Sequence, residues 1–200
     1  MFKEKLGRLE KVELREIWEK EDTHFTPWLA REENIELLGS VIDMDLVVEA
    51  EEKDVGPFRA DILCKDIASN NWVLIENQLE KTDHKHLGQL LTYATGLDAV
   101  TIIWVASEFT EEHRATLDWL NKITDTQYNF FGIKVELFKI GDSKVAPVFN
   151  VVSKPNNWSR SISSAASKIA NEDLGETKLF QLKFWTALGD SITEKTDSPL

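Results

Sequence analysis

Hydrophobic and polar residues alternate along the chain with two periodicities, one of which predicts strands and the other helices. Apolar, β-branched and aromatic residues at every second position, or in short unbroken runs, predict strands at residues 45–52, 58–65, 72–79, 99–106 and 133–140. Apolar residues three or four positions apart predict helices at residues 26–42, 82–96 and 110–123. Residues 8–21 fit a short strand and an amphipathic helix equally well.

The ends and the strength of these patterns suggest how the elements are arranged. Thr82 or Asp83 is a suitable N-cap for the second helix, and Thr110 for the third. The almost unbroken apolar run at residues 99–106 indicates a strand covered on both faces, whereas the alternation at 133–140 indicates an edge strand. The order helix, three strands, helix, strand, helix, strand predicts an α/β fold with a mixed sheet and helices on both faces.

The composition is that of a globular protein with one main domain. Of the 200 residues, 42% are hydrophobic and 29% are charged, which excludes collagen-like, low-complexity and wholly disordered classes. Cys64 is the single cysteine, so no internal disulfide can form. The first residues carry charges where a signal peptide needs an apolar run, and no apolar run is long enough to span a membrane. We therefore expect a cytoplasmic protein without membrane contact.

The net charge of −12 argues against simple electrostatic binding of nucleic acid. Residues 143–171 differ from the rest, because they contain basic but no acidic side chains. This segment is either a polar contact surface or an ordinary polar loop and helix, and we favour the second. Trp72, Trp104 and Trp119 lie in apolar patterns and predict core positions, whereas Trp158 is a candidate for base stacking.

Two acids stand in strands that are otherwise apolar. Glu76 and Gln78 are two residues apart and share one face of their strand, and Asp61 lies in the preceding strand. If these strands pair, the two carboxylates converge, which costs free energy unless a cation, a proton or a hydrogen-bond donor compensates. Carboxylates are the ligands that Mg²⁺ or Mn²⁺ prefers, and such an ion can polarise a phosphodiester and activate water. The pattern therefore indicates a site for a hard divalent cation.

The same residues resemble the PD-(D/E)XK nuclease superfamily. Asp61, then Glu76-Asn77-Gln78, and then a helix with Gln89-Leu-Leu-Thr-Tyr93 are most similar to its RecB-like branch, which carries a Q-x-x-x-Y helix. The amino-acid sequence around Glu76 is also similar to that of uncharacterised prokaryotic proteins in which a nuclease-like domain precedes a second domain. The resemblance implies a restriction-endonuclease-like three-layer α/β/α sandwich with a central mixed sheet. We expect this domain at residues 1–171, and a linker or the truncated start of a second domain at residues 172–200.

The resemblance also implies a nuclease that depends on Mg²⁺ or Mn²⁺ and hydrolyses phosphodiester bonds, in DNA in preference to RNA. Asp61 and Glu76 would hold the ion and act with Gln78 as catalytic residues. The residues expected to contact the substrate are Lys81, Gln89 and Tyr93. The family usually has lysine where Gln78 stands, and glutamine can neither supply a positive charge nor act as a base. The alternative is therefore a degenerate nuclease-like module that binds nucleic acid or a protein partner without cleavage. A homodimer is compatible with either function.

Some neighbouring residues leave more than one role open. Lys65 and Lys81 are candidates for the missing ammonium group, although we expect both to be solvated surface lysines. Glu36 matches a position from which some relatives add a third carboxylate, but a solvent-facing acid is the simpler expectation. His84 and His86 are two residues apart on a helix and diverge, so we expect capping and surface roles rather than one shared metal ion.

Overall fold

The computed structural model describes residues 6–55, 58–97, 101–125 and 128–155, without the side chains of residues 52–55, 58–59 and 93–97. The chain divides into two units, Met1–Asn156 and Asn157–Leu200, and all described residues belong to the first. The domain boundary expected at residue 171 and the candidate stacking residue Trp158 lie outside the described residues. None of the described helices is long and apolar enough to cross a membrane.

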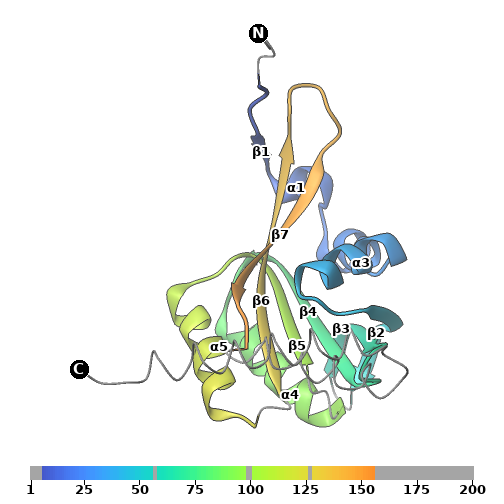
Figure 1. The fold of residues 1–200 in the computed structure, drawn as a ribbon, viewed down its shortest axis with the longest axis vertical. Coiled ribbons are helices and arrows are strands. Elements are labelled where there is room, and N and C mark those ends of the chain that lie inside the picture. The colour runs from blue at the N-terminus through green and yellow to red at the C-terminus, as the bar shows by residue number, and fades with distance from the viewer. Residues whose placement is uncertain (1–5, 56–57, 98–100, 126–127, 156–200) are drawn as a thin grey trace, which may run out of the picture. The chain divides into compact units, whose positions relative to one another are not determined.

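A mixed sheet forms the centre of the described fold (Figure 1). Its strands are β1 (Glu10–Val12), β2 (Leu46–Val55), β3 (Phe58–Asp66), β4 (Trp72–Lys81), β5 (Thr101–Glu108), β6 (Asn129–Lys139) and β7 (Ala146–Ser153). Their order is β1-β6-β5-β4-β3-β2, and β7 also pairs with β6. Strands β2, β3 and β4 pair antiparallel, β4, β5 and β6 pair parallel, and both β1 and β7 run antiparallel to β6. The predicted mixed sheet is confirmed.

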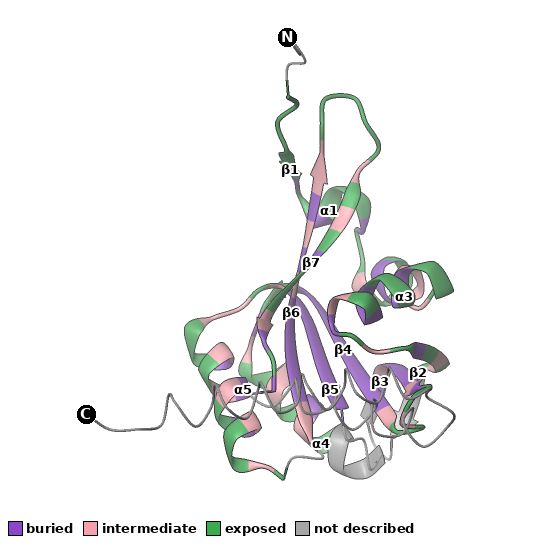
Figure 2. Ribbon diagram, in the orientation of Figure 1, coloured by how far each residue is buried: buried purple, intermediate pink, exposed green. Residues whose placement is uncertain are grey.

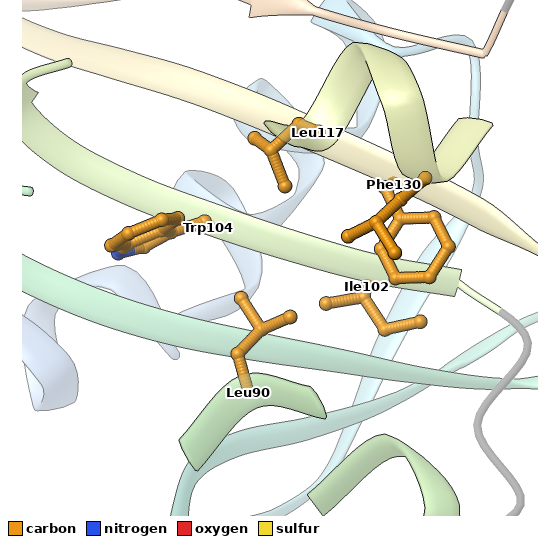
Figure 3. Close-up of a cluster of buried hydrophobic side chains, with 6 residues drawn as sticks. Leu90, Ile102, Trp104, Leu117 and Phe130 are labelled. Carbon is orange, nitrogen blue, oxygen red and sulfur yellow. The ribbon is translucent and has the colours of Figure 1, made fainter. Parts of the chain in front are cut away.

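Helical segments cover both faces of this sheet. They are α1 (Leu14–Ile17), the π-helical turn η1 (Glu21–Phe25), α2 (Thr26–Leu29), α3 (Glu32–Val41), α4 (His84–Leu97) and α5 (Glu111–Ile123). On one face, the Asn77 side chain of β4 donates a hydrogen bond to the Thr26 hydroxyl at 3.0 Å. On the other face, Trp104 of β5 packs in one cluster with Leu90 of α4 and Leu117 of α5 (Figure 3). The α/β fold class, with helices on both sides of a central mixed sheet, is therefore confirmed.

Burial follows the apolar runs of the sequence. Every residue from Val73 to Leu79 on β4 and from Thr101 to Ala106 on β5 is buried, as Figure 2 shows for the centre of the sheet. These are the central strands, so each side chain meets a helix layer on its own face. The expectation of a strand covered on both faces at residues 99–106 is confirmed for β5.

Several sequence-based expectations differ from the structure. Residues 8–21 contain both a strand, β1, and a helix, α1. The single helix expected at residues 26–42 is divided into α2 and α3, because Arg31 is extended (φ −68°, ψ 144°) and forms the N-cap position of α3. The expectation that residues 133–140 form an edge strand is wrong, since β6 pairs with β5 on one side and with β7 on the other. Strand β7 replaces the first part of the expected polar loop and helix.

The expected core position of Trp119 is also wrong, because this side chain is 56% exposed. The buried residues of α5 are His113, Leu117 and Leu120. Trp119 follows Leu117 by two positions, which turns it away from the sheet on a helix with 3.6 residues per turn. Trp104, by contrast, is fully buried as expected.

Candidate active site at the carboxyl end of strand β4

The structure brings Asp61 and Glu76 to neighbouring positions where the pairing of β3 and β4 ends. Ile62 and Ile75 are the last paired residues, so Asp61 and Glu76 are the next residue on each strand. The Oδ2 atom of Asp61 accepts the backbone N–H of Asn77 at 2.6 Å. The Asp61 carboxylate therefore lies against β4 directly beside the residue that follows Glu76.

Gln78 lies two residues beyond Glu76 on the same face of β4, and its side chain is held in one orientation. Its Nε2 group donates to the backbone carbonyl of Lys81 and to Oδ2 of Asp83, both at 2.9 Å. Both amide hydrogens are thus used within the protein. Among the described residues, its Oε1 atom is buried and has no hydrogen-bond partner. A buried oxygen without a partner costs roughly 1–3 kcal/mol, so it indicates a place where a ligand can bind.

Gln78 lines a cleft of about 410 Å³ next to this end of the sheet. The residues around the cleft are Arg15, Glu19, Lys20, Glu21, Asp22, Gln78, Glu80, Lys81, Asp83 and His86. Five of these are acidic and three are lysine or arginine, so the fixed charges of the lining are negative in sum. A concave surface with this charge concentrates cations rather than anions.

Glu21 is a further acid of this cleft that the sequence did not indicate. Its Oε2 atom accepts the backbone N–H of Leu79 at 2.5 Å, which places the carboxyl at the end of β4. Burial raises the pKa of Glu21, and the hydrogen bond from Leu79 and the nearby His86 and Arg15 offset this only in part. A half-buried acid with a raised pKa in a cleft is typical of functional sites. Glu36, the acid considered from the sequence, is exposed on α3 and is not part of the cleft.

The two lysines considered as a replacement for the family's lysine have different positions. Lys81 lines the cleft, and its Nζ atom lies 3.0 Å from Oε1 of Glu108. This hydrogen bond and ion pair lower the pKa of Glu108. Lys65 pairs with Trp72 at the other end of β4, and its Nζ atom lies 4.7 Å from the centre of the Trp72 ring. Lys65 therefore cannot supply an ammonium group near Gln78, whereas Lys81 is close to it.

The first turn of α4 is organised by Asp83. Its Oδ1 atom accepts the backbone N–H of His86 at 2.9 Å, and Nδ1 of the same histidine lies 2.9 Å from both carboxylate oxygens. Burial opposes ionisation of Asp83, but the hydrogen bonds from His86 outweigh it and lower the pKa of Asp83. His84 instead contacts His113 of α5, with 2.8 Å between Nδ1 and Nε2. The two histidines thus have different partners.

The residues expected on the substrate-facing side of α4 are placed only in part. Gln89 is half-buried on this helix. The backbone of Tyr93 belongs to α4, but its side chain lies outside the described part of the chain. The substrate contacts of both residues stay predictions.

The oxygen atoms at this site suit a hard divalent cation. Across residues 6–55, 58–97, 101–125 and 128–155, no three His, Cys, Asp or Glu side chains are grouped as metal ligands. The oxygen donors at this end of β4 are instead the carboxylates of Asp61 and Glu76 and the amide oxygen of Gln78, and of these three residues only Gln78 lines the cleft. Mg²⁺ and Mn²⁺ accept such mixed oxygen ligands and keep several waters. The residues present therefore fit the predicted ion.

Comparison with known proteins gives partial likenesses only. No protein-family profile matches the chain, and no protein of curated function matches its sequence. A solved repair endonuclease from Pyrococcus abyssi is 23% identical over 44% of this chain and 43% of its own, with a TM-score of 0.37. EndoMS in complex with double-stranded DNA is 22% identical over 52% of this chain and 45% of its own, with a TM-score of 0.38. The chain spans less than half the length of either structure, and likenesses of this size assign neither a family nor a function.

Proposed function

We propose that the protein is a nuclease that requires Mg²⁺ or Mn²⁺ and hydrolyses phosphodiester bonds in DNA, as a member of the RecB-like branch of the PD-(D/E)XK superfamily. The observation that carries this proposal is the buried Oε1 atom of Gln78. It lies on the same strand face as Glu76 and near Asp61, which suits an ion held by all three side chains. The functional domain is the one expected at residues 1–171.

We assign the residues of the site separate roles in metal binding, proton transfer and substrate contact. A bound Mg²⁺ or Mn²⁺ ion would polarise the phosphodiester and lower the pKa of a bound water. The backbone N–H of Asn77 keeps the Asp61 carboxylate in place, and the contacts with Lys81 and Asp83 fix the orientation of the Gln78 amide, which would hold the ion together with Asp61 and Glu76. Glu21, whose pKa is raised by burial, is the residue we assign to accept a proton from the attacking water. Lys81, Gln89 and Tyr93 are the residues we assign to substrate contacts.

The charge of the cleft explains why an ion is needed. Arg15 is held by Glu80, with 2.6 Å between Nη2 and Oε1, and Lys81 is held by Glu108. These cations are therefore partly neutralised before a phosphate arrives. A polyanion approaching a lining with more acids than bases is repelled unless a divalent ion reverses the local charge. We thus expect DNA binding at this site to depend on the metal ion.

A module without catalytic activity, which binds nucleic acid or a protein partner, is the second candidate function. The observation in its favour is Gln78 itself, because a neutral amide with both hydrogens used internally cannot stabilise a charged transition state as lysine does. The net charge of −12 favours a protein partner over nucleic acid for such a module.

Titration calorimetry with MnCl₂ and cleavage of supercoiled plasmid test the two candidates. We expect the parent protein to bind Mn²⁺ and to nick the plasmid, and we expect Asp61→Asn and Glu76→Gln to lose both properties. Glu36→Gln is the matched control, since it removes an exposed acid outside the cleft and should change neither. A parent protein that takes up no Mn²⁺, or a Glu76→Gln variant that keeps full cleavage, would contradict the proposed nuclease.

A further inference from the structure

The turn between β4 and α4 holds the Gln78 side chain, and it is fixed in turn by the neighbouring junction between β5 and α5. Thr82, in the middle of this turn, is only 4% exposed. Its backbone N–H donates to the Glu108 carbonyl at 2.9 Å, and its Oγ1 atom accepts the backbone N–H of Thr110 at 3.1 Å. The position of the Gln78 amide therefore depends on how Thr82 is held.

His113 of α5 completes this connection. It is 4% exposed, and its Nδ1 atom lies 2.8 Å from Oγ1 of Thr82, while its Nε2 atom lies 2.8 Å from Nδ1 of His84. Its ring also packs against Trp104, with 5.4 Å between the ring centres. A buried histidine thus links an exposed histidine to the turn beside the site.

The hydroxyl groups of Thr82 and Thr110 define where the hydrogens of this hydrogen-bond network lie at neutral pH. Oγ1 of Thr110 accepts the backbone N–H of His113 at 3.2 Å, and it also lies 3.1 Å from Nδ1 of the same histidine. Oγ1 of Thr82 accepts from Thr110 and keeps one hydrogen to donate. Of the two hydroxyls near Nδ1 of His113, that of Thr82 is the nearer, at 2.8 Å, so we assign it as the donor to Nδ1, with Nε2–H of His113 donating to His84.

As long as the two rings stay in contact, an added proton has one place to go. The contact between the two rings holds one hydrogen, and Nε2 of His84 holds another, so a third must reside on Nδ1 of His113, whichever ring carries the charge. This N–H is then donated to the hydroxyl oxygen of Thr82 or Thr110, and in either case the Thr82 hydrogen loses Nδ1 as its acceptor in a buried position. Protonation of the pair therefore weakens the anchor of the turn.

We propose that His113 is a positioning residue for the site around Gln78: neutral, it anchors the Lys81–Asp83 turn through Thr82, and protonation of the His84–His113 pair releases that turn. The inference rests on the proposed function for its relevance to catalysis. Two observations besides geometry agree with it. Burial, followed by the neighbouring His84, lowers the pKa of His113, which keeps this ring neutral near pH 7, while Asp83 and Glu112 oppose the shift only in part. Histidine is also the side chain whose charge ordinarily changes between pH 5 and 8.

The side-chain amide signals of Gln78 in a ¹H–¹⁵N spectrum of the full chain test the coupling without any metal or DNA. They are assigned by their disappearance in Gln78→Glu. In the parent, we expect them to shift as the pH falls from 8 to 5.5. In His113→Asn, whose amide oxygen can accept from Thr82 but does not titrate, we expect the shift to vanish. Thr82→Ser should keep the parent behaviour and Thr82→Val should lose it, because only serine retains the hydroxyl.

His86 is the competing cause, since it is also an imidazole and contacts Asp83, a partner of Gln78. If His86→Gln abolishes the pH response while His113→Asn retains it, the proposal is wrong. Should His113→Asn not fold, the exposed His84→Gln must change the pH at which the signals move, and an unchanged midpoint refutes the coupling.

Mn²⁺ titrations at pH 7.5 and 5.5 connect the coupling to the proposed function. In the parent, the affinity should fall by about tenfold at the lower pH, the factor that one hydrogen bond of ordinary net strength is worth. His113→Asn should remove that difference, and equal falls in both proteins would overturn the role in positioning. A protein that binds no Mn²⁺ but still moves its Gln78 signals with the His84–His113 pair refutes the nuclease and leaves the anchor intact.

Discussion

Replacing Gln78 by glutamate changes one group of the site and almost no volume. The lost NH₂ group donates to the Lys81 carbonyl and to the Asp83 carboxylate, both at 2.9 Å. A neutral hydrogen bond contributes about 1 kcal/mol, and one to a charged acceptor about 1.5–3 kcal/mol, so Gln78→Glu loses about 2.5–4 kcal/mol of unfolding free energy. Because the Asp83 side chain is 48% exposed, we expect the lower part of this range. For a domain of this size that corresponds to a fall in Tm of about 5–10 °C.

Two conditions should reverse this loss if the site is assigned correctly. Below about pH 4.5, the introduced carboxyl group binds a proton and can donate to Asp83 again, so the difference from the parent should shrink. At neutral pH, Mn²⁺ should raise the Tm of Gln78→Glu more than that of the parent, since the substitution adds a charged oxygen beside Glu76.

Urea and thermal unfolding with and without MnCl₂ measure these effects. Asn71→Asp is the matched control, because it makes the same amide-to-acid exchange at an exposed turn residue and should cost no more than about 0.5 kcal/mol. An unchanged Tm in Gln78→Glu would show that the two amide hydrogen bonds do not hold the side chain. The orientation of Oε1, and the ion site built on it, would then be refuted.

Three further predictions follow from individual groups. Folding raises the pKa of Glu21, so this acid stabilises the fold below its ordinary pKa of 4.5 and loses that contribution as the pH rises through the folded pKa. Glu21→Gln should therefore be more stable than the parent in urea unfolding at pH 7. Equal stability would contradict the burial of this acid. The pKa of His113 is lowered, so the fold loses stability as the pH falls below its ordinary 6.5, and His113→Asn should flatten the Tm profile between pH 7 and 5. Lys81→Ala, at an exposed ion pair, should leave Tm unchanged but weaken DNA binding in the presence of Mn²⁺, measured by fluorescence anisotropy.

The parts of the fold predicted from the sequence are those in which local pattern and burial agree. Strands β4 and β5 carry continuous apolar runs because each is covered on both faces, and their limits differ from the prediction by only a few residues. The N-caps Asp83 and Thr110 follow from short polar side chains directly before apolar periodicity. Strand β7 differs from the prediction because the composition of residues 143–171 is typical of a polar loop, although Val148, Phe149 and Val151 within this segment are residues that favour strands.

In the candidate site too, contacts that follow from local sequence spacing could be predicted, and contacts between distant parts of the chain could not. The neighbourhood of Asp61, Glu76 and Gln78 follows from strand spacing and hairpin register, so the sequence could indicate it. Glu21 could not be found, since its partner is the backbone of Leu79, 58 residues away, and it stands in a π-helical turn without periodicity. A backbone N–H leaves no signal in side-chain identity, so only the folded chain reveals this contact.

The physical consequence of glutamine at position 78 differs from what the sequence suggests. The resemblance to the nuclease superfamily suggests that Gln78 stands where a lysine is usual, so that a positive charge is absent. In the structure, its amide hydrogens face two acceptors, and a lysine ammonium at the same place would be drawn to the Asp83 carboxylate rather than to a substrate. Glutamine instead donates to both acceptors and keeps a neutral, buried amide oxygen, on a side chain that shares one face of β4 with Glu76. Because the other two proposed ligands, Asp61 and Glu76, are carboxylates, a neutral amide would add less mutual repulsion to the proposed ion site than a third carboxylate would. Gln78 is therefore better suited to holding a cation than to replacing one.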